Sequence, residues 1–263
     1  MERAFVILVF LAFAPAGPAQ DKSKGKPVRD VVAEAIVRKA IAAHGGRDAL
    51  AKHATVRFAI KGTIIVGKTE NPFTGVVTTS APDKYRLEME AILDKQKYTV
   101  TEVVNGTHVK SVRQLGGLPY AELSDAERDD LIASAAVQEV NQLYPLLEPK
   151  RFTLKSAPDE DVNGKPAAGV MAVFVESKKE VKLLFDRETG LLVMTSRKGL
   201  GPGENGPVEV VQDAVMSGFK VFDGIKVATS VRVRNDGKPF MRFEVTGYSH
   251  VDKPDPKLFE TDG

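Results

Sequence analysis

The sequence contains no cysteine. Disulfide bonds, thiolate metal sites and a cysteine nucleophile are therefore all excluded. A lipid anchor on the chain itself is excluded as well, because the signal of a bacterial lipoprotein ends on a cysteine. The stability of the fold must come from burial of its core, for which 263 residues with 43% hydrophobic side chains are sufficient.

An excess of one charge is also absent. The chain has 37 Lys and Arg against 35 Asp and Glu, a formal net charge of +2, and the two signs are interspersed. A clustered basic patch is the usual footprint of nucleic-acid binding. We therefore expect no nucleic-acid partner.

Apolar runs of membrane length are missing too. The one long run, residues 4–14, follows Arg3 and is shorter than the roughly 20 residues of a transmembrane helix. Small residues follow it, as in a signal-peptidase site. We expect residues 1–20 to be a signal peptide cleaved near Ala16 or Ala19, and residues 21–27 to be a flexible polar leader. The mature chain is then periplasmic or secreted.

Residues 28–263 are expected to form a single domain. Residues 28–43 carry Val32, Ile36 and Ala40 on one helical face, which Val37 and Ile41 widen, and a Gly-Gly pair follows as a stop signal. From residue 55 the apolar period changes to two, which predicts strands. The pairs Asn105-Gly106 and Asn163-Gly164 are strong hairpin signals. Helix, strands, one more helix and then many strands is an α+β order rather than a βαβ order.

The pattern of residues 181–196, VKLLFDRETGLLVMTS, predicts a hairpin with apolar side chains on both faces of both strands. Such strands must be covered above and below. The pattern predicts that this hairpin lies in the middle of a large antiparallel sheet, with an apolar layer across it.

A capping box predicts the start of the second helix. In this motif the side chain of Ser124 accepts from the backbone amide of Glu127, and the side chain of Glu127 accepts from the backbone amide of Ser124. Pro145 should end or kink this helix near Tyr144. Its predicted apolar stripe consists of Ile132, Ala136, Val140, Leu143 and Leu147.

Residues 62–69, GTIIVGKT, match the phosphate-loop pattern. A phosphate loop must follow a strand and open a helix, whereas Ile64 and Val66 continue the alternation of the preceding strand. Asn71 and Pro72 then prevent a helix from starting. We therefore interpret the segment as a strand and expect no bound nucleotide.

Two other segments also have simple structural interpretations. Residues 159–164 resemble the start of a calcium loop, but Val170 stands where that loop needs a bidentate Glu, so a turn between strands is expected. Residues 199–207 are rich in Gly and Pro, which predicts a loop.

No catalytic or metal constellation is apparent. His44, His53, His108 and His250 are far apart in the sequence, without the spacing of a zinc site. No catalytic triad can be assembled from spacing. We expect no metal, no cofactor and no enzymatic activity, although side chains from distant positions could still converge on a site.

Several segments in a fixed order resemble the LolA/LolB-like superfamily of periplasmic lipoprotein carriers. The signal peptide is followed by AIAAHGG at residues 40–46, by a helix that ends near Leu147, and by NGKP at 163–166. LLFDRETGLLV at residues 183–193, FDGI at 222–225 and PKLF at 256–259 complete the series. The likeness covers nearly all of the mature chain, but the chain is longer than the carriers.

The resemblance implies an incomplete, half-open antiparallel β-barrel with helices covering its concave face. A lipid, a lipoprotein acyl chain or another apolar ligand would lie there, with an envelope membrane protein as a second partner. Strand and helix phase predict the residues of this cavity. They are Phe58, Ile60, Ile64, Leu87, Met89, Ile132, Val140, Leu143, Leu183, Phe185, Val233 and Phe243.

Strand phase is the critical step, because a one-residue slip would exchange Leu183 and Phe185 for Leu184. The alternative to a carrier is an envelope scaffold or interaction module on the same fold with a filled core. That alternative predicts no cavity of roughly 300 Å³ or more.

Overall fold

The computed structural model describes residues 30–67, 69–120, 122–203 and 206–261. The expected signal peptide and leader lie outside these residues. The main feature is one antiparallel sheet of 13 strands in the order β6-β5-β4-β3-β2-β1-β15-β14-β11-β10-β9-β8-β7. Its strands are β1 (Thr55–Val66), β2 (Thr69–Ser80), β3 (Lys84–Leu93), β4 (Gln96–Asn105), β5 (His108–Leu115), β6 (Leu118–Pro119), β7 (Phe152–Val162), β8 (Lys165–Phe174), β9 (Glu180–Asp186), β10 (Leu192–Gly203), β11 (Gly206–Ser217), β14 (Ser230–Asn235) and β15 (Lys238–His250).

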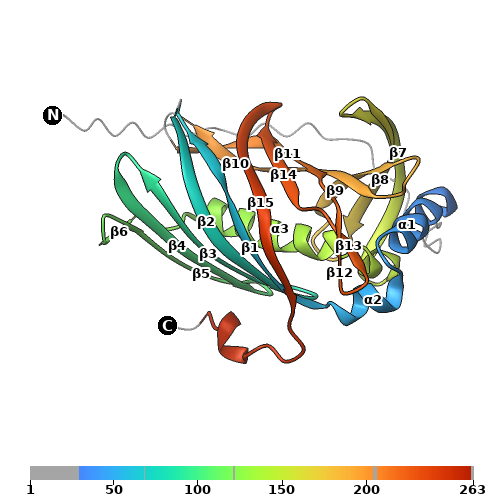
Figure 1. The fold of residues 1–263 in the computed structure, drawn as a ribbon, viewed down its shortest axis with the longest axis horizontal. Helices are drawn as coiled ribbons and strands as arrows, with labels where there is room; N and C mark the ends of the chain where they lie inside the picture. The colour runs from blue at the N-terminus through green and yellow to red at the C-terminus, as the bar shows by residue number, and fades with distance from the viewer. Residues whose placement is uncertain (1–29, 68, 121, 204–205, 262–263) are drawn as a thin grey trace, which may run out of the picture.

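The remaining elements lie at the sheet's ends or across one face (Figure 1). Strands β12 and β13 form a separate small hairpin. These elements are α1 (Val31–Ala43), α2 (Arg47–Lys52), α3 (Asp125–Asn141), the 3₁₀ turns η1 (Tyr144–Leu147) and η2 (Pro256–Phe259), β12 (Lys220–Phe222) and β13 (Ile225–Val227). No helix in the described part of the chain is long and apolar enough to cross a bilayer.

The sheet is curved and open, with β6 and β7 at its two edges (Figure 1). Strands β1 to β6 follow one another as hairpins, and β7 to β11 form a second series. The last strand, β15, closes the seam between the two series by pairing with β1, where Ile60 lies opposite Val245. The α+β order with a large antiparallel sheet is therefore as predicted.

The positions of several hairpin turns were predicted correctly. Gly106 follows β4 with a positive φ of 61°, and Asn163 and Gly164 join β7 to β8 with φ of 56° and 81°. These left-handed angles are those of a tight hairpin turn. The segment that imitates a calcium loop is thus the end of β7 and the hairpin turn after it, so the predicted turn between strands is present.

The segment that imitates a phosphate loop lies in a β-hairpin. Residues up to Val66 belong to β1, and β2 starts at Thr69, so no helix follows the motif. Lys68 of the motif lies outside the described residues.

Two predictions were wrong in position or kind, and one strand was missed. Strand β2, which runs through Pro72 and Gly75, was not predicted. Residues 199–203 and 206–207 are strand rather than loop, because β10 and β11 pair as far as Gly203 and Gly206. The β9–β10 hairpin is interior but not central, since β15 holds the middle position.

Both faces of that hairpin are nevertheless buried, as its composition indicates. Leu183 and Phe185 belong to a core cluster that includes α1, while Leu184 packs on the opposite face with Val162 and Met194. We call the face that carries Leu183 and Phe185 the inner face, because α1 and α3 lie on it (Figure 1).

Helix α1 begins at the N-cap Asp30, whose carboxylate accepts from the amides of Val32 and Ala33. Its buried residues are Ala33, Val37, Ala40 and Ile41, while Val32 is 58% exposed. The buried stripe therefore keeps Val37, Ala40 and Ile41 of the predicted face and takes Ala33 in place of Val32.

Helix α3 begins with the predicted capping box of Ser124 and Glu127. The helix ends at Asn141, and Leu143 takes a positive φ of 62° before Pro145 enters η1. The chain thus turns away from the helix axis, and the predicted stripe is divided between α3 and η1.

Candidate functional site: a cavity between the sheet and helix α3

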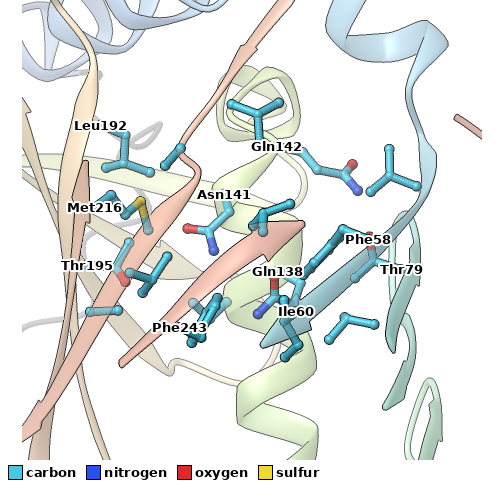
Figure 2. A pocket seen from close by; sticks show the side chains of 18 of the residues that line it. Phe58, Ile60, Thr79, Gln138, Asn141, Gln142, Leu192, Thr195, Met216 and Phe243 are labelled. Carbon is cyan, nitrogen blue, oxygen red and sulfur yellow. The ribbon is translucent and has the colours of Figure 1, made fainter. Parts of the chain in front are cut away.

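A cavity of about 440 Å³ lies between the inner face and α3. Phe58, Ile60 and Thr79 line it from β1 and β2, and Phe243 lines it from β15 (Figure 2). Met216 and Thr195 line it from β11 and β10. The volume lies within the range of small-molecule pockets.

Strand register explains why these side chains meet. Across the sheet, Phe58 lies opposite Val77, and Val77 opposite Leu87. On the other side of the seam Ile60 lies opposite Val245, and Val231 opposite Phe243. Directly paired residues point to the same face, so one apolar band crosses from β3 to β14.

The structure places half of the predicted cavity residues in this lining. They are Phe58, Ile60, Leu87, Met89, Val233 and Phe243. Ile64 lies on the same band, partly buried against the cluster of Ile60 and Phe73, but outside the lining. Ile132 on α3 is half-buried and also outside it.

The other four predicted residues pack in the core. Val140 and Leu143 are fully buried, as are Leu183 and Phe185, with exposed fractions of 0 to 1%. Ala33, Val37 and Ile41 of α1 belong to the same cluster. Helix α1 packs on β7 and β8, and the cluster that it forms there takes in Leu183 and Phe185 as well as Val140 and Leu143 at the end of α3. Most of the cavity lining therefore comes from the rest of the inner face.

Polar side chains of α3 face the cavity, which the sequence analysis missed. Ser134, Gln138, Asn141 and Gln142 are in the lining, with Val137 between them. The amides of Gln138, Asn141 and Gln142 lie between α3 and the strands in Figure 2. The signal was present in the sequence, because these positions fall on one side of a 3.6-residue helix.

Three arginines tie α3 to the sheet from different sides. Arg197 of β10 bonds Asp130 at 2.6 Å (Nη1 to Oδ1) and Ser134 at 2.9 Å (Nη2 to Oγ). Arg113 of β5 bridges Glu127 and Glu102 at 3.0 and 3.1 Å. Arg151, just before β7, makes two bonds of 2.8 and 2.9 Å to Glu139.

Two carboxylates of these contacts are buried. Burial raises the pKa of the Glu102 carboxyl, and the hydrogen bond and charge of Arg113 oppose the rise. Burial likewise raises the pKa of Glu139, against the effect of Arg151. The arginines therefore compensate for the desolvation of the carboxylates and hold α3 over the cavity.

His44 joins three elements at the end of the cavity next to α1. Its Nδ1 lies 2.7 Å from the carbonyl oxygen of Lys226, and its Nε2 accepts from the amide of Leu192 at 3.1 Å. Since a carbonyl can only accept, Nδ1 carries the proton and the ring is the neutral tautomer. Burial lowers the pKa of His44 and favours this neutral form.

His53 lies near the same end. Burial lowers its pKa, and the nearby His250 ring, 4.8 Å away between centroids, lowers it further. Its Nδ1 has no hydrogen-bond partner among the described residues. Within those residues no group of three or more His, Asp or Glu side chains is placed to hold a metal ion.

No family model and no curated protein matches the sequence. Solved structures with a similar fold include a DUF1329 family protein from Desulfovibrio piger, with 12% identity and a TM-score of 0.52 over 87% of this chain and 97% of that one. A LolA superfamily protein from Nitrosomonas europaea matches with 10% identity and a TM-score of 0.49 over the same shares. A domain described as outer membrane lipoprotein-sorting, from Vibrio parahaemolyticus, matches with 7% identity and a TM-score of 0.45 over 86% and 94%.

The fold is therefore similar to that of the Desulfovibrio piger protein, and a LolA superfamily protein is among the similar structures, as the sequence resemblance predicted. Of these three structures, the Desulfovibrio piger protein alone has a TM-score above 0.5. At such low identity the likeness shows a shared fold and nothing of function.

Proposed function

We propose that this chain is an exported carrier that holds the apolar part of a lipid, such as the acyl chain of a lipoprotein, between its sheet and α3. In this proposal the sheet is an incomplete barrel, α3 is its lid, and the single domain of residues 28–263 works in the periplasm or outside the cell. Loading or unloading would take place at an envelope membrane protein.

The observation that carries the proposal is the cavity of about 440 Å³ with its band of apolar side chains. Phe58, Leu87, Met89, Met241 and Phe243 line it without being fully buried. Leaving such side chains in contact with water costs roughly 25 cal/mol per Å² of apolar surface. An apolar ligand would recover that free energy.

A carrier fits these features better than an enzyme or a filled scaffold. A scaffold does not need the void, and the histidines of the lining have structural contacts, as His44 shows with Lys226 and Leu192. The polar side chains of α3 suit the recognition of a ligand rather than its chemical conversion.

The test is uptake of a fluorescent fatty acid by delipidated protein. Leu87→Trp fills the cavity from β3, so it should weaken uptake about ten-fold or more, which equals the loss of roughly 1.4 kcal/mol of binding free energy. Glu90→Trp is the matched control, because Glu90 is exposed on the outer face of the same strand. If wild type takes up no probe, or both variants bind like wild type, the carrier proposal is wrong and the scaffold takes its place.

Mass spectrometry of material extracted from natively purified protein would name the ligand. N-terminal sequencing of the same material should show cleavage near Ala16 or Ala19, and a chain that begins at Met1 would contradict export.

A further inference from the structure

From the polar side of the cavity we infer that the ligand is a neutral amphiphile whose polar group donates hydrogen bonds, such as a hydroxyl or an amide N–H. The inference rests on the proposed function and specifies the class of ligand. It starts from acceptors in the lining that the described residues leave without donors.

Two of these acceptors are side-chain oxygens at the end of α3. Asn141 Oδ1 and Gln142 Oε1 are buried and have no hydrogen-bond partner among the described residues. Both residues line the cavity, and Figure 2 shows their amides between α3 and the strands. Each oxygen is closed to solvent in the unliganded protein, so its side chain must rotate toward the cavity before a ligand can donate to it. An unpaired buried polar atom costs about 1–3 kcal/mol, and a donor that reaches it binds with that gain.

The orientation of the Gln142 amide is fixed by the backbone. Its Nε2 donates to the carbonyl oxygen of Ala54 at 3.4 Å. A carbonyl accepts only from the NH₂ group, so the atom left free in Gln142 is the oxygen. The unsatisfied group is therefore an acceptor, and the missing partner is a donor.

A third polar atom without a partner belongs to His53, which also lines the cavity. Its Nδ1 has no hydrogen-bond partner among the described residues, and burial lowers the pKa of the ring and so favours the neutral form. In the tautomer that is protonated at Nε2, Nδ1 carries a lone pair and accepts from a donor.

The charges of the lining residues make a cationic head group a poor fit. None of the described lining residues is Asp or Glu, while Arg197 and Lys226 are both present. Arg197 is itself neutralised by Asp130. An ammonium group would find acceptors here but no counter-charge, and burying an unpaired charge is far more costly than burying an amide or hydroxyl.

The test compares two amides that share a chain and a carbonyl and differ in the substituents on nitrogen. Dodecanamide has a chain, a carbonyl and an NH₂ group, and N,N-dimethyldodecanamide has the same chain and carbonyl without N–H. Each displaces the fluorescent probe N-phenylnaphthylamine from delipidated wild-type protein. We expect dodecanamide to bind about ten-fold tighter, the equivalent of one or two hydrogen bonds. Dodecylammonium should bind more weakly than dodecanamide.

Substitutions then locate the preference. Asn141→Leu keeps the number and branching of the side-chain heavy atoms but removes the acceptor, so it should reduce the preference for dodecanamide several-fold. The same substitution should leave the unliganded protein as stable as wild type or more stable, because an unpaired amide is lost. Phe58→Ala, at an apolar position of the lining, should weaken both amides equally and leave their ratio unchanged.

The outcomes separate this inference from the carrier proposal. If both amides displace the probe equally well from wild type, the ligand inference is wrong and the carrier proposal stands. A tighter dodecylammonium would also overturn it. If the protein binds neither the probe nor any of the three compounds, both proposals fail.

Discussion

Asp130 of α3 and Arg197 of β10 form an ion pair of 2.6 Å that lies mostly out of solvent, with side-chain exposed fractions of 20% and 8%. The guanidinium also donates to Ser134 on α3 and to Gln212 on β11. One side chain of the sheet thus connects the middle of α3 to two strands at the cavity.

Asp130→Ala should lower the free energy of unfolding by about 2–4 kcal/mol, because it leaves the Arg197 charge partly buried and unpaired. Urea unfolding measures the loss, and hydrogen exchange should be faster in the α3 amides than in β9. Asp129→Ala is the control, since Asp129 is the exposed neighbour with the same charge. Equal effects of the two substitutions would contradict the role of the pair.

His44 should make stability depend on pH. Its pKa is lowered in the folded protein by burial, while in the unfolded chain it returns to about 6.5. Below that pH the unfolded chain binds a proton that the folded state resists, so the free energy of unfolding should fall as pH drops from 7 to 5. His53, whose pKa burial also lowers, adds a slope of the same sign.

His44→Phe should flatten this slope without abolishing it. The variant keeps a ring beside Phe219, whose centroid is 5.9 Å from that of His44, but it loses the bonds to Lys226 and Leu192. We expect a cost of about 2 kcal/mol at pH 7.5 from two lost hydrogen bonds and their orphaned backbone groups. Urea unfolding at several pH values measures both effects. The exposed His108→Gln should change neither, and an unchanged slope in His44→Phe would show that other groups cause it.

The sequence predicted the elements better than the layers that cover them. Alternation and turn residues identified β1, β3 and the hairpin at Asn105-Gly106, because these signals are local. Strand β2 was not predicted because Pro72 and Gly75 usually argue against an interior strand. Strand β2 pairs with β1 on one side and with β3 on the other. This pairing holds it in the sheet although its own strand propensity is low.

The cavity could be predicted only in part for a related reason. Periodicity shows which side chains share a face but not which helix covers them. The phase of β9 was correct, since Leu183 and Phe185 do share the inner face, yet α1 covers them. On α3 the apolar stripe was assumed to face the ligand, whereas Gln138 and Asn141 face the cavity. Polar positions with a function are where local rules fail most often.

This correction gives a different expectation for Phe185, which the sequence placed at the ligand. Phe185 is 1% exposed and packs in the core with α1, so Phe185→Ala should lower the free energy of unfolding by about 3–5 kcal/mol. Phe58→Ala, at a half-buried lining position, should cost less stability but weaken lipid uptake more. Urea unfolding and probe titration measure both variants. If Phe185→Ala lost uptake at full stability, the core assignment would be wrong.

Gly62 gives the last prediction, because it is the first residue of the apparent phosphate loop. In the structure it lies in β1 opposite Phe243 of β15. A Cβ at Gly62 would lie 2.1 Å from the backbone oxygen of Arg242. The glycine is therefore required by the close approach of two strands at the seam of the sheet and not by a phosphate.

Gly62→Ala should destabilise the protein by about 1–3 kcal/mol, since the clash is with backbone, which must shift. Gly247→Ala is the matched control in the same strand pair, because its Cβ would meet only Ala59 Cβ at an ordinary 3.7 Å. Urea unfolding of the two variants measures the difference. Should Gly62→Ala be as stable as Gly247→Ala, or should wild type bind a nucleoside triphosphate that Gly62→Ala does not, the strand interpretation of this motif would fail.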